Sequence, residues 1–99
     1  MTILAFDTCF DACSVAVARV RADGSVDVVG QQALMATGQA EALMPMIARV
    51  MAEAGTAFAE ISRIAATHGP GTFTGTRITV AAARAFQLAL GVPVVPVSS

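Results

Sequence analysis

The chain has 99 residues and a formal net charge of −1, with 56% hydrophobic and only 13% charged residues. A chain of this length forms at most one domain, and its six scattered arginines, with no lysine, make a poor clamp for nucleic acid. No apolar run reaches the roughly 20 residues of a transmembrane helix, and no basic region precedes the first one, so we expect a cytoplasmic protein without a signal peptide.

The first third of the chain predicts three antiparallel strands. Residues 2–8 are a short apolar run that leads into a turn, and residues 14–21 alternate valine with small or basic residues. Strict alternation is typical of a strand with one buried face. A turn at 22–25 (ADGS) and a return strand at 26–35 complete the meander.

The apolar period then changes to that of a helix. Residues 39–54 predict a helix with two neighbouring apolar stripes, one of Leu43, Ile47, Val50 and Ala54 and the other of Met44 and Met51. Pro45 lies inside this pattern, so the helix either starts near it or is kinked there.

The remaining residues alternate strand and helix. We expect a strand at 62–67, a helix at 74–90 that Gly91 ends, and a final strand at 92–98. The order β-β-β-α-β-α-β, with right-handed crossovers, predicts an α/β fold: a ribonuclease-H-like, five-stranded mixed sheet with helices.

The stretch HGPGTFTGTR at 68–77 joins the predicted strand to the second helix. It lacks the lysine of a Walker A loop, and its glycines miss the spacing of a dinucleotide fingerprint. The glycines around Pro70 predict a turn in which Thr72 or Thr74 caps the helix. The alternative keeps this geometry and adds an anion at the helix N-terminus, with Arg77 one turn in.

The remaining chemistry-bearing side chains form no strong motif. Cys9 and Cys13, spaced C-x3-C, match neither a redox pair nor half of a zinc site, so we expect buried thiols, with a disulfide or a reactive thiol as alternatives. His68 is the single histidine, and with Asp7 and Asp11 it makes a poor transition-metal site. We therefore predict no metal in this chain.

Three segments resemble the TsaB family, also called YeaZ: residues 3–17, 38–47 and 68–78. The closest match is GPGTFTGTRI, which fits the family pattern GPG-[ST]-FTG-x-RI at every fixed position. The resemblance implies the actin and sugar-kinase superfamily, whose members have two ribonuclease-H-like lobes. Residues 1–99 would be the N-terminal lobe, without the second.

The resemblance also implies a function in tRNA modification. The chain would be a non-catalytic scaffold or activating subunit of the complex that places a threonylcarbamoyl group on the adenosine beside the anticodon. TsaD would carry the metal and perform the transfer, TsaE would join the complex, and tRNA would bind only through it. Alone, the chain would be a homodimer.

Two other classes of function remain open. A glycopeptidase-like or nucleotide-binding enzyme of the same superfamily is the first, although the helix at 39–54 lacks the H-x3-H pair of the catalytic paralogue. A self-associating module with no link to tRNA is the second.

Two sets of residues are candidates for function. Asp7 and Thr8 lie where the superfamily places its first phosphate loop, so the expected nucleotide or anion contacts are Asp7, Thr8, Thr72, Thr74 and Arg77. No cofactor is expected in the chain itself, and ATP or ADP would belong to the assembled complex. The methionine stripe and the alanine-rich second helix predict a protein interface, formed by Leu43, Met44, Ile47, Met51, Ile78, Ala81 and Ala85; ordinary burial within the lobe is the competing explanation.

Overall fold

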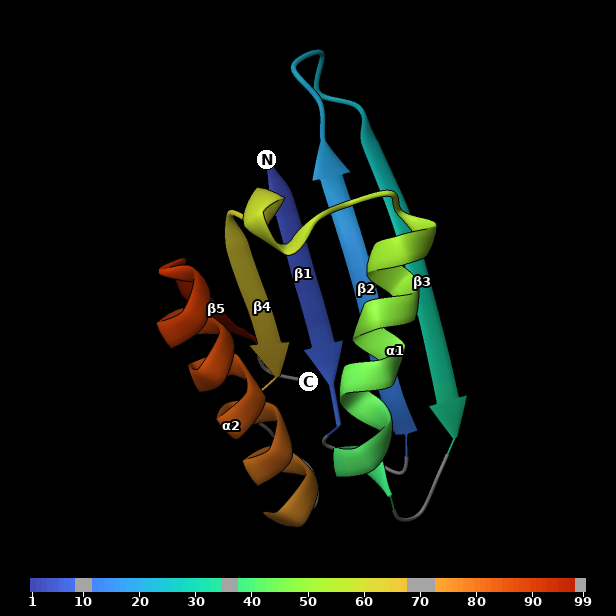
Figure 1. The fold of residues 1–99 in the computed structure, drawn as a ribbon, viewed down its shortest axis with the longest axis vertical. Helices are drawn as coiled ribbons and strands as arrows, with labels where there is room; N and C mark the ends of the chain where they lie inside the picture. The colour runs from blue at the N-terminus through green and yellow to red at the C-terminus, as the bar shows by residue number, and fades with distance from the viewer. Residues whose placement is uncertain (9–11, 35–37, 68–72, 98–99) are drawn as a thin grey trace.

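The computed structural model describes residues 1–8, 12–34, 38–67 and 73–97. Figure 1 shows a sheet with two long helices lying on it. The elements, in chain order, are β1 (Thr2–Asp7), β2 (Ala12–Val20), β3 (Val26–Leu34), α1 (Gln39–Glu53), the short 3-10 helix η1 (Phe58–Glu60), β4 (Arg63–Thr67), α2 (Phe73–Leu90) and β5 (Val94–Val97). This order confirms the sequence prediction, apart from η1, which no pattern indicated.

The five strands form one mixed sheet in the order β3-β2-β1-β4-β5. β1 pairs with β2 and β2 with β3 in antiparallel fashion, whereas β4 runs parallel to both β1 and β5. The sheet therefore confirms the predicted α/β, ribonuclease-H-like arrangement, with β1 at its centre.

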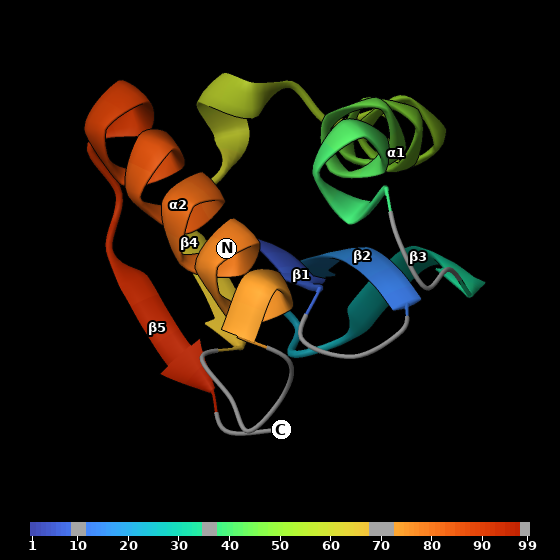
Figure 2. The ribbon, with the colours of Figure 1, turned by 90° about the horizontal axis from the view of Figure 1, so that it is seen from below.

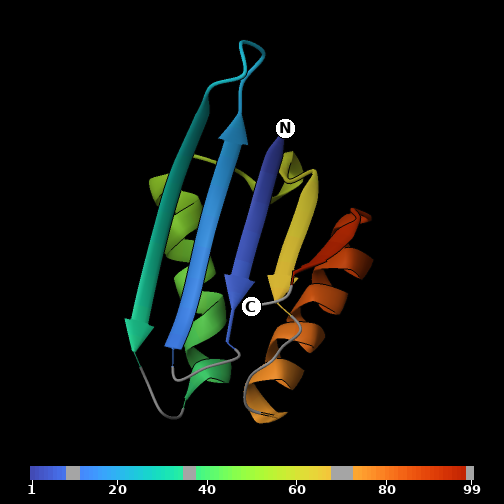
Figure 3. The same ribbon diagram turned by 180° about the vertical axis from the view of Figure 1, so that it is seen from behind.

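Both helices cover the same face of the sheet, as Figure 2 shows from below. On that face the strands present large apolar side chains, among them Leu4, Phe6, Val15, Val17 and Ile64, each no more than 3% exposed. The period of two along a strand places the intervening residues on the opposite face. Figure 3 shows that no described helix covers this face.

Helix α1 contributes one buried face rather than two independent stripes. Leu43, Ile47, Val50 and Met51 are all at most 2% exposed, whereas Met44 is 50% exposed. Met51 was therefore wrongly predicted to share the exposure of Met44. Residues seven apart lie within about 20° of each other around a helix, so the two methionines differ by their position along α1, and only Met51 packs into the core. Pro45 is exposed within the helix, which begins six residues earlier, at Gln39.

Two threonines attach α2 to the central strand. The Thr8 amide N–H donates to Thr79 Oγ1 at 2.9 Å, and the two hydroxyl oxygens lie 2.6 Å apart. Both residues are 0% exposed. A buried hydroxyl is stable only when it is hydrogen-bonded, so this pair fixes where α2 meets the end of β1.

The burial of α1 gives a stability test with a control on the same helix. We expect Ile47→Ala to lower the free energy of unfolding by about 2–5 kcal/mol, because the Ile47 side chain is fully buried. Met44→Ala should cost less than about 0.5 kcal/mol, as usual for an exposed position. Urea denaturation followed by circular dichroism measures both, and equal losses would contradict this assignment of the buried face.

The threonine pair gives a second test. We expect Thr79→Val, which preserves the shape of the side chain, to lower the free energy of unfolding by about 1–3 kcal/mol, because the buried Thr8 amide loses its acceptor. Thr79→Ser retains the hydroxyl and should cost less. A valine variant as stable as the wild type in chemical denaturation would show that the hydroxyl contact is dispensable.

Candidate functional site

Asp7 and Thr67 lie at the carboxyl ends of the neighbouring parallel strands β1 and β4. The Thr67 hydroxyl donates to Asp7 Oδ1 at 2.6 Å, and both residues are half-buried. In α/β sheets, ligands bind outside the carboxyl ends of parallel strands. This edge is therefore the first candidate site.

Helix α2 begins at Phe73, so its N-terminus follows the carboxyl end of β4 by a short connection. A helix N-terminus favours anions through its amide groups and its dipole. Arg77 is exposed on the next turn. The predicted strand-to-helix position of the glycine motif is confirmed, while Thr72 and the side chain of Thr74 lie outside the described residues.

Thr8 is less suited to ligand binding than the sequence suggested. Its side chain is 0% exposed, and its amide and hydroxyl both contact Thr79. Thr8 therefore fixes the position of the strand end, and its side chain is not accessible to a ligand. The structure pairs Asp7 with Thr67, and Thr8 with Thr79. Neither Thr67 nor Thr79 was predicted from the sequence. Only the parallel ends of β1 and β4 could have indicated Thr67.

Cys13 lies in the core beside this edge, with 0% exposure and no disulfide. Burial raises the pKa of its thiol, and the Asp7 carboxylate raises it further. Because the thiolate is the reactive form of cysteine, the thiol here serves as a packing group. This burial agrees with the prediction for Cys13, whereas Cys9 lies outside the described residues.

The described residues contain no cluster of three histidine, cysteine, aspartate or glutamate side chains that could hold a metal ion. His68 and Asp11, weighed as ligands in the sequence, lie outside them. Within the described part of the chain, no helix is long and apolar enough to cross a membrane.

A broad hollow of about 510 Å³ opens on the uncovered face of the sheet. One cross-strand row of its lining consists of the small residues Gly30, Ala16, Ala5 and Ala65. The next row towards the carboxyl edge is polar and includes Asp7, Ser14 and Gln32. The first candidate site thus continues onto the open face.

A second candidate surface lies on the facing sides of the two helices. Of the predicted interface residues, Leu43, Ile47 and Met51 are in the core, and Ile78 is half-buried against it. Met44, Ala81 and Ala85 are exposed. Helical periodicity places Met44 and Ala48 on one flank of α1, and Ala81 and Ala85 on the flank of α2 away from β5.

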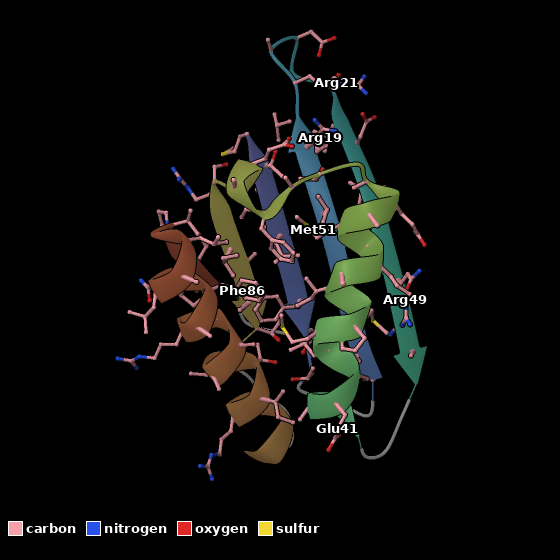
Figure 4. The ribbon with its side chains drawn as sticks, viewed as in Figure 1. Arg19, Arg21, Glu41, Arg49, Met51 and Phe86 are labelled. Carbon is pink, nitrogen blue, oxygen red and sulfur yellow. The ribbon has the colours of Figure 1, made fainter. Side chains whose placement is uncertain are left out.

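We call these four exposed residues, Met44, Ala48, Ala81 and Ala85, the α1–α2 surface. Figure 4 shows the two helices side by side across the sheet, with the buried Met51 and Phe86 between them. Small side chains allow another helix to approach closely, and methionine adapts to varied partners. The arrangement therefore suits a helical partner lying over both helices.

Comparisons with known proteins agree with this fold. Residues 32–99 match the family model described as TsaD, tRNA N6-adenosine threonylcarbamoyltransferase. The whole chain is 34% identical to the tRNA threonylcarbamoyladenosine biosynthesis protein TsaB of Escherichia coli (strain K12), of which it covers 41%. Over 99% of its length it is 30% identical to a tRNA N6-adenosine threonylcarbamoyltransferase of Maricaulis maris, of which it covers 30%.

The solved structures give the same result. YeaZ from Pseudomonas aeruginosa superposes on 98% of the chain with a TM-score of 0.88 and 36% identity, and the match covers 43% of that protein. The Thermus thermophilus RuvC structure, at 14% identity and a TM-score of 0.57, supports the ribonuclease-H-like fold alone.

The chain spans about two fifths of the length of the TsaB and YeaZ proteins it matches. The match to them extends over nearly all of its own residues, in sequence and in structure alike. Its TsaD-like domain, the identity to TsaB and the superposition on YeaZ agree with one another, and the chain belongs to the TsaB (YeaZ) family of tRNA threonylcarbamoyladenosine biosynthesis proteins.

Proposed function

We propose that this chain is the N-terminal lobe of a non-catalytic scaffold and activating subunit in tRNA threonylcarbamoyladenosine synthesis. It binds the catalytic paralogue TsaD through the α1–α2 surface, TsaE joins the complex, and tRNA binds only to the assembly, in the cytoplasm. Alone, the chain is a homodimer. The single observation that carries this proposal is the pair of exposed helix flanks, Met44 and Ala48 facing Ala81 and Ala85.

The chemistry of the surface supports a protein partner. On α2 an exposed apolar side chain beside Ala81 and Ala85 is Leu88 (82%), whereas Val80 (46%) lies on the β5 flank together with Gln87. The only charged residues of α2 are Arg77 and Arg84, both exposed. Apolar and alanine-rich flanks beside two arginines suit a helical partner with an apolar stripe and acidic neighbours.

The non-catalytic role is supported by the residues of α1 and of the strand ends. α1 carries no histidine, so it has no H-x3-H pair like that of the catalytic paralogue. Thr8 and Cys13 are buried and serve packing. Nucleotide, in this proposal, belongs to the assembled complex.

A second candidate function is a transferase or related nucleotide-binding enzyme. The 30% identity to the Maricaulis maris transferase favours it. Threonylcarbamoylation of tRNA by the purified chain without TsaD would establish this alternative and exclude the scaffold role.

Binding to TsaD tests the surface directly. We expect Ala85→Arg to weaken association with TsaD about tenfold or more, equal to about 1.4 kcal/mol, because a long charged side chain prevents close helix packing. Gln87→Arg is the matched control, since Gln87 is exposed on the opposite flank of α2 beside β5. Titration by light scattering or calorimetry measures both, and equal losses, or a wild-type chain that does not bind TsaD, would refute the proposed surface.

Nucleotide binding tests whether the isolated chain has a nucleotide site of its own. We expect ADP with magnesium to leave the Tm of the isolated chain unchanged, because a ligand raises Tm only when it binds the folded state. A concentration-dependent rise in Tm that is abolished in the Asp7→Asn variant would instead place a nucleotide at the carboxyl edge of β1. Thermal unfolding with and without ADP distinguishes the two results.

A further inference from the structure

A second hollow, of about 400 Å³, lies between α2 and the edge strand β5 and has no part in the proposed function. Figure 2 shows β5 at the margin of the fold, on the side of α2 away from α1. Binding sites for small molecules commonly have volumes of about 300–1,000 Å³. We call this hollow the α2–β5 pocket and define it by six of its lining residues: Ala66, Val94 and Pro96 on the strands, and Val80, Arg84 and Gln87 on the helix.

The strands give the pocket an apolar floor. In the parallel ladder, Ile64 is paired with Val94, and Ala66 with Pro96. Because Ile64 and Ala66 are buried under the helices, Val94 and Pro96 project from the same face of the sheet. The side chain of Ala66 is a single methyl group, which leaves space between the sheet and this flank of α2. The floor therefore suits an apolar group.

Helix α2 gives the pocket a wall with a positive charge. Val80, Arg84 and Gln87 follow one another at intervals of four and three residues, so they share one flank of the helix. All three are exposed. The guanidinium of Arg84 and the amide of Gln87 can therefore both reach a ligand that lies on the apolar floor.

No acidic side chain of the surrounding segment neutralises Arg84. Residues 61–99, which contain β4, α2 and β5, include no aspartate or glutamate, so all seven acidic residues lie in the first 60. Arg19 pairs with Glu60 at 3.7 Å, whereas Arg84 forms no ion pair within the part of the chain that the structure describes. An unpaired arginine beside an apolar pocket indicates a ligand with a negative charge.

We propose that the α2–β5 pocket binds a small carboxylic acid whose carboxylate is attached to a branched apolar body. The Arg84 guanidinium holds the carboxylate through two parallel N–H···O bonds, the geometry typical of this pair. The Gln87 amide donates a further hydrogen bond to the same group. The apolar body lies against Val80, Val94 and Pro96 and is removed from water there.

The composition of the pocket favours a monocarboxylate over other anionic ligands. A phosphate group carries nearly two charges and three acceptor oxygens, more than one guanidinium and one amide can satisfy. A peptide strand is also disfavoured, because Pro93 and Pro96 interrupt the edge of β5 that it would extend. A short aliphatic body fills the floor without leaving a buried polar group unpaired.

Isovalerate, a small branched carboxylate, is the probe for a titration of the complete chain. We expect saturable shifts of the amide NMR signals of α2 and β5, with a Kd on the order of 1 mM, because the ligand has few atoms. Arg84→Gln removes the positive charge and should weaken binding at least about tenfold. Arg49→Gln is the matched control: Arg49 is an exposed arginine on α1, away from the pocket, and binding should stay unchanged.

Two further ligands separate the contribution of the carboxylate from that of the apolar body. Isovaleramide has the same shape without the charge, and acetate has the charge with almost no body. We expect each to bind at least about tenfold more weakly than isovalerate, because each lacks one of the two contacts that the pocket provides. Circular dichroism checks that Arg84→Gln remains folded.

Four results would overturn the proposal. Two concern the probe itself: no saturable shift with isovalerate, or binding that is unchanged in Arg84→Gln. Equal binding of isovaleramide would show that the charge has no role, and equal binding of acetate would reduce the contact to a plain surface anion. TsaD is absent from these titrations, so their outcome leaves the scaffold proposal to its own test.

Discussion

The contact between Thr8 and Thr79 is the constraint on which the functional surfaces depend. It joins residues 71 positions apart through two fully buried hydroxyl groups and one amide. It fixes α2 against the end of β1, next to Asp7, at a point six residues after the helix begins. It also sets the flank of α2 that carries Ala81 and Ala85 opposite α1. One buried polar contact thus determines the geometry of both candidate sites.

Local patterns were sufficient to predict the strands and helices. The alternation in β2 indicated a half-buried strand, and Cys13, Val15 and Val17 are indeed buried. The two helices follow from apolar residues three and four positions apart. η1 escaped prediction because its three residues, Phe58–Glu60, are too few to show an apolar period. Its Phe58 ring stacks on the Phe86 ring at a centroid distance of 6.0 Å.

The site was harder to predict, for a similar reason. Nothing in the local sequence distinguishes Thr67 and Thr79 from other threonines of a strand or a helix. Their hydrogen bonds form only in the folded chain, where β4 brings Thr67 beside Asp7 and α2 brings Thr79 beside Thr8. For α1, the apolar period was predicted correctly, but a local pattern could not show that Met51 packs into the core while Met44, seven residues earlier, stays exposed. Met44, Ala81 and Ala85, the exposed part of the predicted interface, stay a prediction.

The large apolar side chains that stay exposed fall into two main groups. Besides Met1 and Phe58, they lie on the helices, at Met44, Val80 and Leu88, and on the edge strands, at Val26, Val28 and Val95. Exposed apolar surface in a folded protein commonly marks an interaction site. The two groups are separated by the packed core, which indicates more than one contact surface.

Helical geometry separates the two exposed flanks of α1. At 100° per residue, Arg49 and Glu53 lie on the flank of α1 that faces β3, whereas Met44 and Ala48 lie on the flank towards α2. The buried Leu43, Ile47 and Val50 occupy the side between these flanks. A helical partner on the α1–α2 surface therefore approaches α1 from the flank towards α2 and does not cover the charged flank beside β3.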